Sequence, residues 1–230
     1  MRSLCVIPAR SGSKGLKDKN ILDLCGKPVL AYSIECCLQS NLFDEVFVAT
    51  DSEEYAKIAK RYGASVPFLE PEEMAADDVS STEPLLYFDE LLGRADDLLW
   101  CIQPTSPLRS VQDLIDAHKL FEEDDECDFV LGTTKVDPHY FHWVLKDGDN
   151  GTAHLHFGSE VMVDRSLLRP LVYRPNGAIK VGRRAAVRKY KHFFGGRIKR
   201  VEMPEDRAIH IRSKLDLDLC RIIMMEGKNA

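Results

Sequence analysis

Residues 43–64 have the sequence FDEVFVATDSEEYAKIAKRYGA, and they contain the alternation that decides the fold. The apolar run at 45–49 predicts a buried strand. The stretch from Ser52 to Tyr62 has the spacing of an amphipathic helix, which Gly63 ends. A strand that is followed directly by a helix is half of a βαβ unit, in which the next strand lies parallel to the first.

The same alternation extends along the chain in both directions from this unit. Its order predicts an α/β fold with a Rossmann-like, doubly wound, mostly parallel sheet and helices on both faces. The expected strands are 4–7, 66–68, 98–103, 127–136, 178–181, 198–203 and 208–211. The other expected helices are 29–38, 82–92, 111–122 and a final one near 214–225.

The alternation changes after about residue 137. The stretch DPHYFHWVLKDGDNGTAHLHF, residues 137–157, predicts strands around a turn at Gly148–Gly151. We therefore expect a single domain over residues 1–230, with a small β-rich lobe inserted at about 137–172. The histidines of this lobe lack the spacing of a metal site, and we interpret them as surface or subunit-contact residues.

Composition limits the classes of partner. The 230-residue chain has a net charge of −6, which argues against non-specific nucleic-acid binding. Its basic residues gather at 10–19 and 183–200, a pattern that favours a small anionic ligand. No stretch of eighteen apolar residues occurs and a strand begins at once, so we expect neither a membrane partner nor a signal peptide. Seven cysteines without a C-x-x-C pair predict reduced core thiols in a cytoplasmic protein.

The loop after the first strand, residues 9–20, combines glycines with four basic side chains. Backbone N–H groups in such a turn form an anion-binding concavity, and the basic side chains add fixed positive charge. We interpret the loop as a phosphate cradle, while a solvated basic turn is the alternative. The sequence matches neither G-x-G-x-x-G nor G-x-x-x-x-G-K-[ST].

Five motifs in register give the chain a family resemblance: IPARSGSKGLKDKNI, GKPVLAYSIE, FDEVFVATDSEEYAKIAKRYGA, IQPTSPLR and YRPNGAI. From Val6 to about Met225 it resembles the acylneuraminate cytidylyltransferases. The resemblance implies a fold of the nucleotide-diphospho-sugar transferase type, a homodimer formed by the lobe, and metal-assisted transfer of CMP from CTP to an acidic 2-keto sugar. Alternatives are a legionaminic, pseudaminic or Kdo-type sugar, or a silent homologue that binds sugar or nucleotide without turnover.

The resemblance also assigns residues to roles. Arg10, Lys19 and Gln103 would be catalytic. The nucleotide would be held by Arg10, Ser13, Lys14, Lys19, Asn20 and Ser81, and the sugar by Gln103, Arg165 (or Arg169), Arg174, Asn176, Phe193 and Phe194. Three of these positions have other interpretations: Ser81 suits a helix N-cap, and the two phenylalanines suit the core. For Arg109, a sugar contact, a helix start and a surface ion pair all stay open.

The chain departs from the family at several positions. In AIHIRS, residues 208–213, His210 and Arg212 stand where the family has two aspartates that bind the divalent metal. Glu70 replaces an arginine near the cytosine pocket, and Lys180 replaces an aromatic residue. An arginine repels a cation, so the implied Mg²⁺ is in question. Arg212 could supply charge in its place, the triphosphate could carry the metal, or Asp216 or Asp218 could approach it.

Overall fold

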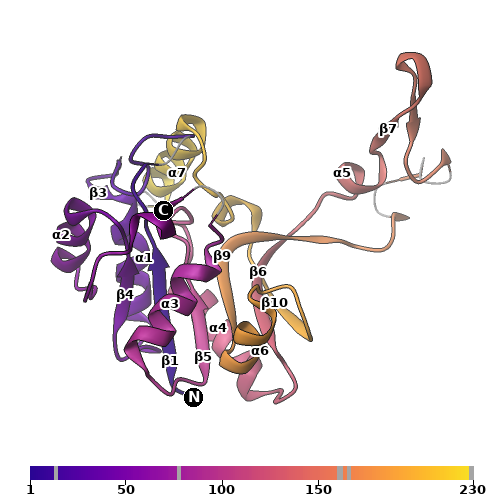
Figure 1. The fold of residues 1–230 in the computed structure, drawn as a ribbon. Helices are drawn as coiled ribbons and strands as arrows, with labels where there is room; N and C mark the ends of the chain where they lie inside the picture. The colour runs from indigo at the N-terminus through magenta and orange to yellow at the C-terminus, as the bar shows by residue number, and fades with distance from the viewer. Residues whose placement is uncertain (13–14, 77–78, 160–162, 165–166, 228–230) are drawn as a thin grey trace.

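The computed structural model describes residues 1–12, 15–76, 79–159, 163–164 and 167–227. A six-stranded sheet with the order β10-β6-β9-β5-β1-β4 forms its centre (Figure 1). β1 pairs in parallel with β4 and β5, and β6 pairs in parallel with β10, whereas β9 runs antiparallel to β5 and β6. This confirms the mostly parallel α/β sheet. The strands are β1 (Ser3–Pro8), β4 (Val46–Ala49), β5 (Leu98–Cys101), β6 (Phe129–Lys135), β9 (Tyr173–Arg183) and β10 (Ile198–Glu202).

Helices cover both faces of the sheet, because successive residues of its strands point to opposite sides. On β5, Trp100 packs into the core under α1, α2 and α4, while Leu99 packs into the core under α3 and α6. Serines set two of the helix starts: Ser52 accepts a hydrogen bond from the backbone of Tyr55, and Ser110 forms a capping box. The helices are α1 (Val29–Gln39), α2 (Glu53–Arg61), α3 (Thr82–Leu92), α4 (Val111–Glu122), α6 (Arg184–Tyr190) and α7 (Lys214–Glu226).

Two expected strands are wrong. At 66–68 the chain makes only an isolated bridge, between Phe47 and Ser65, because Pro67 has no N–H to continue a ladder. At 208–211 the chain is irregular and makes one backbone bond to the loop after β5, from the Ile211 N–H to the Thr105 carbonyl at 2.8 Å. The short helix α6 follows β9 directly and was not expected from the sequence.

The described residues between 136 and 172 project from the body as an arm (Figure 1). The arm contains the short helix α5 (Pro138–His142) and a hairpin of β7 (Leu145–Asp147) and β8 (Ala153–Leu155), which confirms strands around the turn at 148–151. The rings of Phe141 and Phe157 contact each other at 5.1 Å between centroids. The arm leaves through β6 and returns through β9, where Lys135 and Tyr173 are paired.

The cysteines are consistent with the expected core thiols. All seven are free, and six of them are buried. Among the residues described, no helix combines the length and the apolar composition that crossing a bilayer requires.

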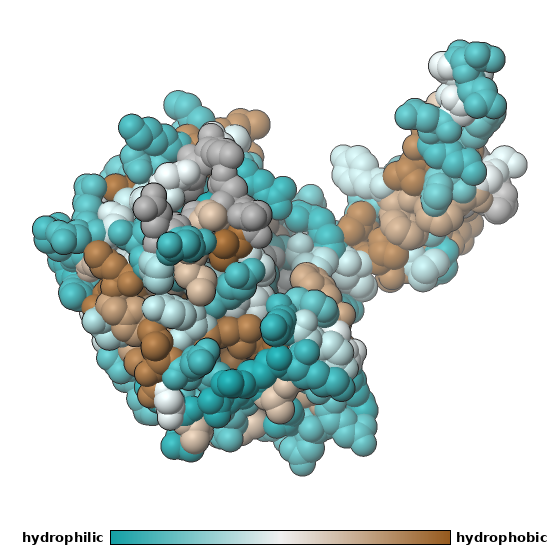
Figure 2. All heavy atoms as spheres, in the orientation of Figure 1, coloured by the Kyte–Doolittle hydropathy of each residue, from teal (hydrophilic) through white to brown (hydrophobic). Residues whose placement is uncertain are grey.

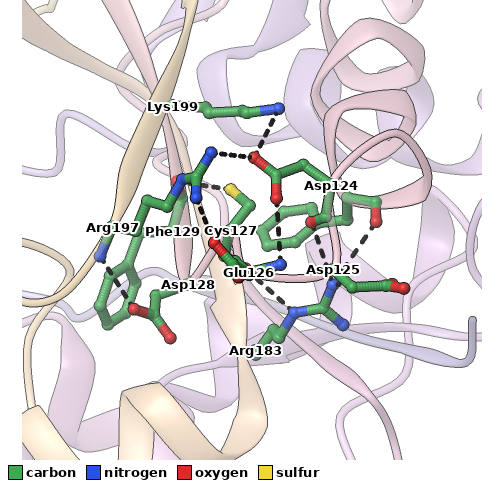
Figure 3. Close-up of polar contacts among 10 residues, drawn as sticks. Asp124, Asp125, Glu126, Cys127, Asp128, Phe129, Arg183, Arg197 and Lys199 are labelled. Atoms are coloured by element: carbon green, nitrogen blue, oxygen red, sulfur yellow. Dashed lines mark hydrogen bonds and ion pairs between the residues drawn. The ribbon is translucent and has the colours of Figure 1, made fainter.

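An acidic segment just before β6, residues 124–128, pairs with basic residues of β9, of β10 and of the position just before β10 (Figure 3). Lys199 lies 2.9 Å and Arg197 lies 3.0 Å from the carboxylate of Asp124. Arg183 donates to the Cys127 carbonyl at 3.0 Å and lies 3.6 Å from Asp125. We call these residues the charge cluster.

The charge cluster corrects one expectation from the sequence. The basic run at 183–200 was interpreted as favouring a small anionic ligand, but most of its arginines have carboxylates of the protein beside them. Besides the pairs just described, Arg184 and Arg188 lie 2.8 Å and 2.6 Å from the fully buried Asp89. The basic residues at 183–200 therefore stabilise the fold through ion pairs within the protein.

Candidate active site

A cavity of about 130 Å³ lies where the carboxyl ends of β1, β4 and β5 meet, the usual ligand position in such sheets. Arg10, Lys19 and Asn20 reach it from the loop after β1. Glu70 and Ser81 come from the segment before α3. The loop after β5 contributes Gln103 and Thr105, and His210 comes from the segment before α7. Five residues predicted from the sequence therefore lie together: Arg10, Lys19, Asn20, Ser81 and Gln103.

The loop after β1 is held by polar contacts at both of its ends. The buried side-chain amide of Asn20 donates to the Arg10 carbonyl at 3.2 Å, which ties the end of the loop to its start. Asp51, which follows β4, accepts hydrogen bonds from the backbone and the hydroxyl of Ser11 at 2.7 and 2.5 Å. These contacts fix Arg10 and Lys19 at the cavity.

Positive charge is concentrated around the cavity. Burial and the neighbouring charges of Arg10 and Arg212 lower the pKa of Lys19. Burial, followed by the charges of Arg212, Lys19 and Lys180, lowers the pKa of His210 to about 4. Several cations thus converge here, and His210 is neutral at pH 7. Such a field favours a polyanionic ligand.

His210 is positioned by the loop after β5. The hydroxyl of Thr105 lies 3.0 Å from Nε2 and 3.3 Å from Nδ1, and the hydroxyl of Ser106 lies 3.2 Å from Nδ1. Gly177 lies against the ring, since a Cβ there would meet Nδ1 at 3.3 Å. The imidazole is therefore packed between the Thr-Ser pair of this loop and the glycine of YRPNGAI.

Lys180 and Ser81 contact each other beside the cavity. Ser81 is the N-cap residue of α3, yet its side chain makes no capping bond and instead accepts a hydrogen bond from Lys180 Nζ at 3.1 Å. The side chain of Gln103 contacts the sulfur of Cys101 at 3.7 Å. The departure at Lys180 therefore adds a cation next to a residue predicted to bind the nucleotide.

Glu70 is the cavity residue that the sequence identified only as a departure from the family. Its side chain is buried, and its Oε1 has no hydrogen-bond partner. Burial, and then the charge of Asp51, raises its pKa to about 7. Near pH 7 the Glu70 carboxyl group is therefore protonated in part of the molecules. It faces a cavity whose other charged lining residues, Arg10 and Lys19, are basic. The signal in the sequence was an acidic residue after the apolar stretch VPFL, next to a proline.

Several predicted sugar-binding residues lie outside the cavity lining, and their roles stay predictions. Arg174 is exposed on β9. The amide of Asn176 is already engaged, since it donates to Thr134 Oγ1 at 3.2 Å and accepts from the Ala178 N–H at 3.0 Å. Phe193 is buried in the core and Phe194 is exposed. The predictions for Ser13, Lys14 and Arg165 fall outside the described residues.

Arg109 is buried, so it does not form the surface ion pair, and it does not line the cavity. Its buried guanidinium donates to the Ala178 carbonyl at 2.7 Å and to the Ser33 hydroxyl at 2.8 Å. It therefore joins β9 to α1 beneath the loop that contains Gln103.

The described residues do not fit a magnesium ion held by the protein. His210 and Arg212 provide no carboxylate, and Asp216 accepts from the backbone and the hydroxyl of Ser213 as the capping box of α7. Asp218 pairs with Lys214 and Arg221. Over the described ranges, no group of three or more His, Cys, Asp or Glu side chains is arranged to hold a metal. Magnesium prefers oxygen ligands, whereas Arg10 and Lys19 in the cavity lining and Arg212 beside His210 are cationic.

The fold of this chain is also found in solved structures. A solved structure of a CMP:2-keto-3-deoxy-manno-octonic acid synthetase complexed with CTP has the same fold, with a TM-score of 0.75 at 18% identity over 99% of this chain and 100% of that one. A cytidylyltransferase family model matches residues 4–165. The chain belongs to the cytidylyltransferase family.

Curated relatives agree with this assignment. The N-acylneuraminate cytidylyltransferase of Escherichia coli O18:K1:H7 is 35% identical over 98% of this chain and 52% of its own length. A pseudaminic acid cytidylyltransferase of Campylobacter jejuni is 30% identical over 97% of this chain and 96% of its own length. The chain spans about half the length of the E. coli relative and nearly all of the Campylobacter one. The family resemblance predicted from the motifs is confirmed.

Proposed function

We propose that this chain transfers CMP from CTP to an acidic 2-keto sugar of the N-acylneuraminate type. In this reaction the anomeric hydroxyl oxygen forms a bond to the α-phosphorus. The bond between that phosphorus and the α,β-bridging oxygen breaks, and pyrophosphate leaves. The hydroxyl proton passes to solvent. The curated relatives with whole-chain similarity act on N-acylneuraminic and pseudaminic acids by their names, which supports this class of acceptor.

The observation that carries the proposal is the cluster of cations at the cavity. A triphosphate carries several negative charges, and charge develops further on the leaving pyrophosphate. Arg10 and Lys19 line the cavity, and Lys180 and Arg212 are close enough to depress the pKa of His210. In the proposed reaction Arg10 and Lys19 hold the phosphates and stabilise the charge that develops on them. Gln103 orients the acceptor sugar.

The proposed role of magnesium follows from the misfit described above. Because no carboxylate cluster among the described residues faces the cavity, we propose that a magnesium ion enters only as part of the substrate, bound to CTP. Arg212 and Lys180 then supply positive charge at the phosphates. By the resemblance, the family obtains this charge from a metal ion that two aspartates hold. Replacing His210 and Arg212 together with aspartate should make pyrophosphate release depend on added magnesium at least tenfold more strongly than in the wild type.

We further propose that the chain works as a homodimer through the arm. Apolar side chains of the arm are exposed, among them Tyr140 at 78% and Leu145 at 63%. In Figure 2, brown and tan surface gathers along the base of the arm. A second copy of the chain would cover this surface. Analytical ultracentrifugation of the wild type and of Y140D/L145D should show a dimer and a monomer, respectively. A cytoplasmic location is part of the proposal, because seven free thiols suit a reducing compartment.

The decisive experiment is pyrophosphate release from each nucleoside triphosphate with a panel of acidic nine-carbon 2-keto sugars and Kdo, in magnesium and in EDTA. We expect release with CTP and one sugar, and its loss in Arg10→Ala. Release with another nucleotide would overturn the assignment of CTP. No release with any pair, while CTP or a sugar still raises the melting temperature, would show a binding protein without turnover.

A further inference from the structure

We propose that Glu70 recognises the nucleobase of CTP as a neutral carboxylic acid, accepting a hydrogen bond from the amino group on C4 and donating one to ring nitrogen N3. This inference rests on the proposed function and adds to it the residue that selects the base. The resemblance places this position near the cytosine pocket but with an arginine there, so the pairing of a neutral acid with the base is not part of it.

The first reason is that a buried polar group in the cavity wall lacks a partner. Glu70 is only 6% exposed, and its Oε1 has no hydrogen bond within the protein. Its backbone is fixed, because the Glu70 N–H donates to the Thr50 carbonyl at 2.8 Å. Leaving a buried acceptor without a partner costs about 1–3 kcal/mol, and a bound ligand with a matching donor recovers that cost.

The second reason is that the surroundings of Glu70 suit a base better than a phosphate. The cavity lining that comes from its own segment includes Met74, Val79 and Pro84, which offer apolar contacts to the faces of a flat ring. The cations of the lining, Arg10 and Lys19, come from the loop after β1. A neutral carboxyl group gives a triphosphate no counter-charge, so the phosphates belong with the cations and the base with Glu70.

The third reason is protonation. Among the described residues, the charged or titratable groups around the cavity are Asp51 after β4, Arg10 and Lys19 after β1, Lys180 on β9, and His210 and Arg212 before α7. Burial and the charge of Asp51 raise the pKa of Glu70 to about 7, so the neutral acid is well populated near neutrality. A neutral carboxyl group has one donor and one acceptor, and the Watson–Crick edge of cytosine presents an acceptor at N3 beside the donor at the C4 amino group.

The test compares the pH dependence of CTP affinity in the wild type and in Glu70→Gln by calorimetry between pH 6 and pH 8. Glutamine has the donor and acceptor of the neutral acid but does not titrate. If only the neutral acid pairs with cytosine, wild-type Kd should rise about tenfold from pH 6 to pH 8 relative to Glu70→Gln. The γ-phosphate titrates in both proteins, so it cancels in this comparison. Glu54→Gln, an exposed site on α2, should behave as the wild type.

A second measurement uses only the wild-type protein and an altered ligand. The ribonucleoside triphosphate of pyrimidin-2-one lacks the C4 amino group, and it should bind about tenfold more weakly than CTP at pH 6. Equal affinity for the two nucleotides, or parallel pH profiles for wild type and Glu70→Gln, would overturn the assignment while CTP binding itself persisted. A loss that followed removal of the ribose 2′-hydroxyl instead would also overturn it, in favour of a ribose contact. No CTP binding at any pH would refute the proposed function itself.

Discussion

The cavity and the charge cluster lie at opposite ends of the sheet. Both contain basic and acidic side chains, but the two regions differ in how far the acidic groups neutralise the basic ones. Before β6, Asp124 and its neighbours stand next to Arg183, Arg197 and Lys199, so each of these cations has a carboxylate of the protein within reach. At the carboxyl ends of the strands, Lys19 and His210 lie among other cations, which depress both of their pKa values. Charge balanced within the chain holds the fold, whereas charge left in excess is available to a ligand.

The pKa shifts express the same difference in terms of protonation. A hydrogen bond from Lys199 is the main cause that lowers the pKa of Asp124. Its folded pKa is below its unfolded one, so this carboxylate stabilises the fold above the unfolded pKa and loses that contribution as the pH falls. At the cavity, like charges act on Lys19 instead, and a bound polyanion would remove that repulsion.

The largest effect is expected when one arginine is removed from each region. Arg10→Ala should weaken CTP binding about 100-fold, because a charge-assisted hydrogen bond to phosphate contributes about 1.5–3 kcal/mol. Arg197→Ala should leave the affinity within about twofold and lower the stability instead. Calorimetry with CTP and urea unfolding of both variants provide the measurements. Equal losses of affinity in the two variants would remove the distinction between the regions.

A loss of stability without a loss of affinity is expected at Asp89. This buried carboxylate lies within 2.8 Å of Arg184 and 2.6 Å of Arg188. Asp89→Ala should lower the free energy of unfolding by about 2 kcal/mol, less than for a fully buried pair because both arginines reach solvent. Urea unfolding measures the change, and CTP affinity measured beside it should stay at the wild-type value. A weakened affinity would mean that these cations also serve the ligand.

A smaller effect is expected at Arg212, which is exposed. Arg212→Ala removes a positive charge that disfavours protonation of its neighbours, so the pKa of His210 should rise above its present value of about 4, and that of Lys19 should rise as well. NMR titration of the imidazole measures the first shift. CTP affinity should fall about threefold, since solvent screens this charge. An unchanged imidazole pKa would show that Arg212 does not contribute to it.

The smallest effect is expected at the rim of the charge cluster. Glu126 pairs with Arg197, and its side chain is 81% exposed. Glu126→Gln should change the free energy of unfolding by less than about 0.5 kcal/mol, because exposed ion pairs contribute little. The same urea experiment detects the change. A loss as large as that of Asp89→Ala would mean that the charge cluster acts as one cooperative network.

Much of the sheet could be predicted because its signals are local. The apolar run around Val6 identifies β1, and helix α4 has the predicted bounds because Ser110 caps its start. The loop after β1 could be placed at the cavity because ligands in parallel sheets bind beyond the carboxyl ends of strands. These inferences need only neighbours in sequence and one rule of topology.

Other features depend on contacts between segments that are far apart in the sequence. Nothing near Asn176 shows that Thr134 engages its amide, and nothing near Arg109 shows that Ser33 and Ala178 accept its hydrogen bonds. The role of the basic run at 183–200 was misjudged for the same reason, since its carboxylate partners lie in other elements. Composition reveals how many charges exist but not how they are paired.

The way in which the arm joins the body has a consequence for evolution and for protein engineering. Its two ends are hydrogen-bonded neighbours, with the Val136 N–H donating to the Val172 carbonyl at 3.0 Å. Everything between these residues can therefore be lengthened, exchanged or excised without shifting the register of β6 against β9. A short turn joining the two strands would give a body-only version of the protein. The arm is thus inserted at one point of the sheet, where its length can change without disturbing the pairing of the two strands that carry it.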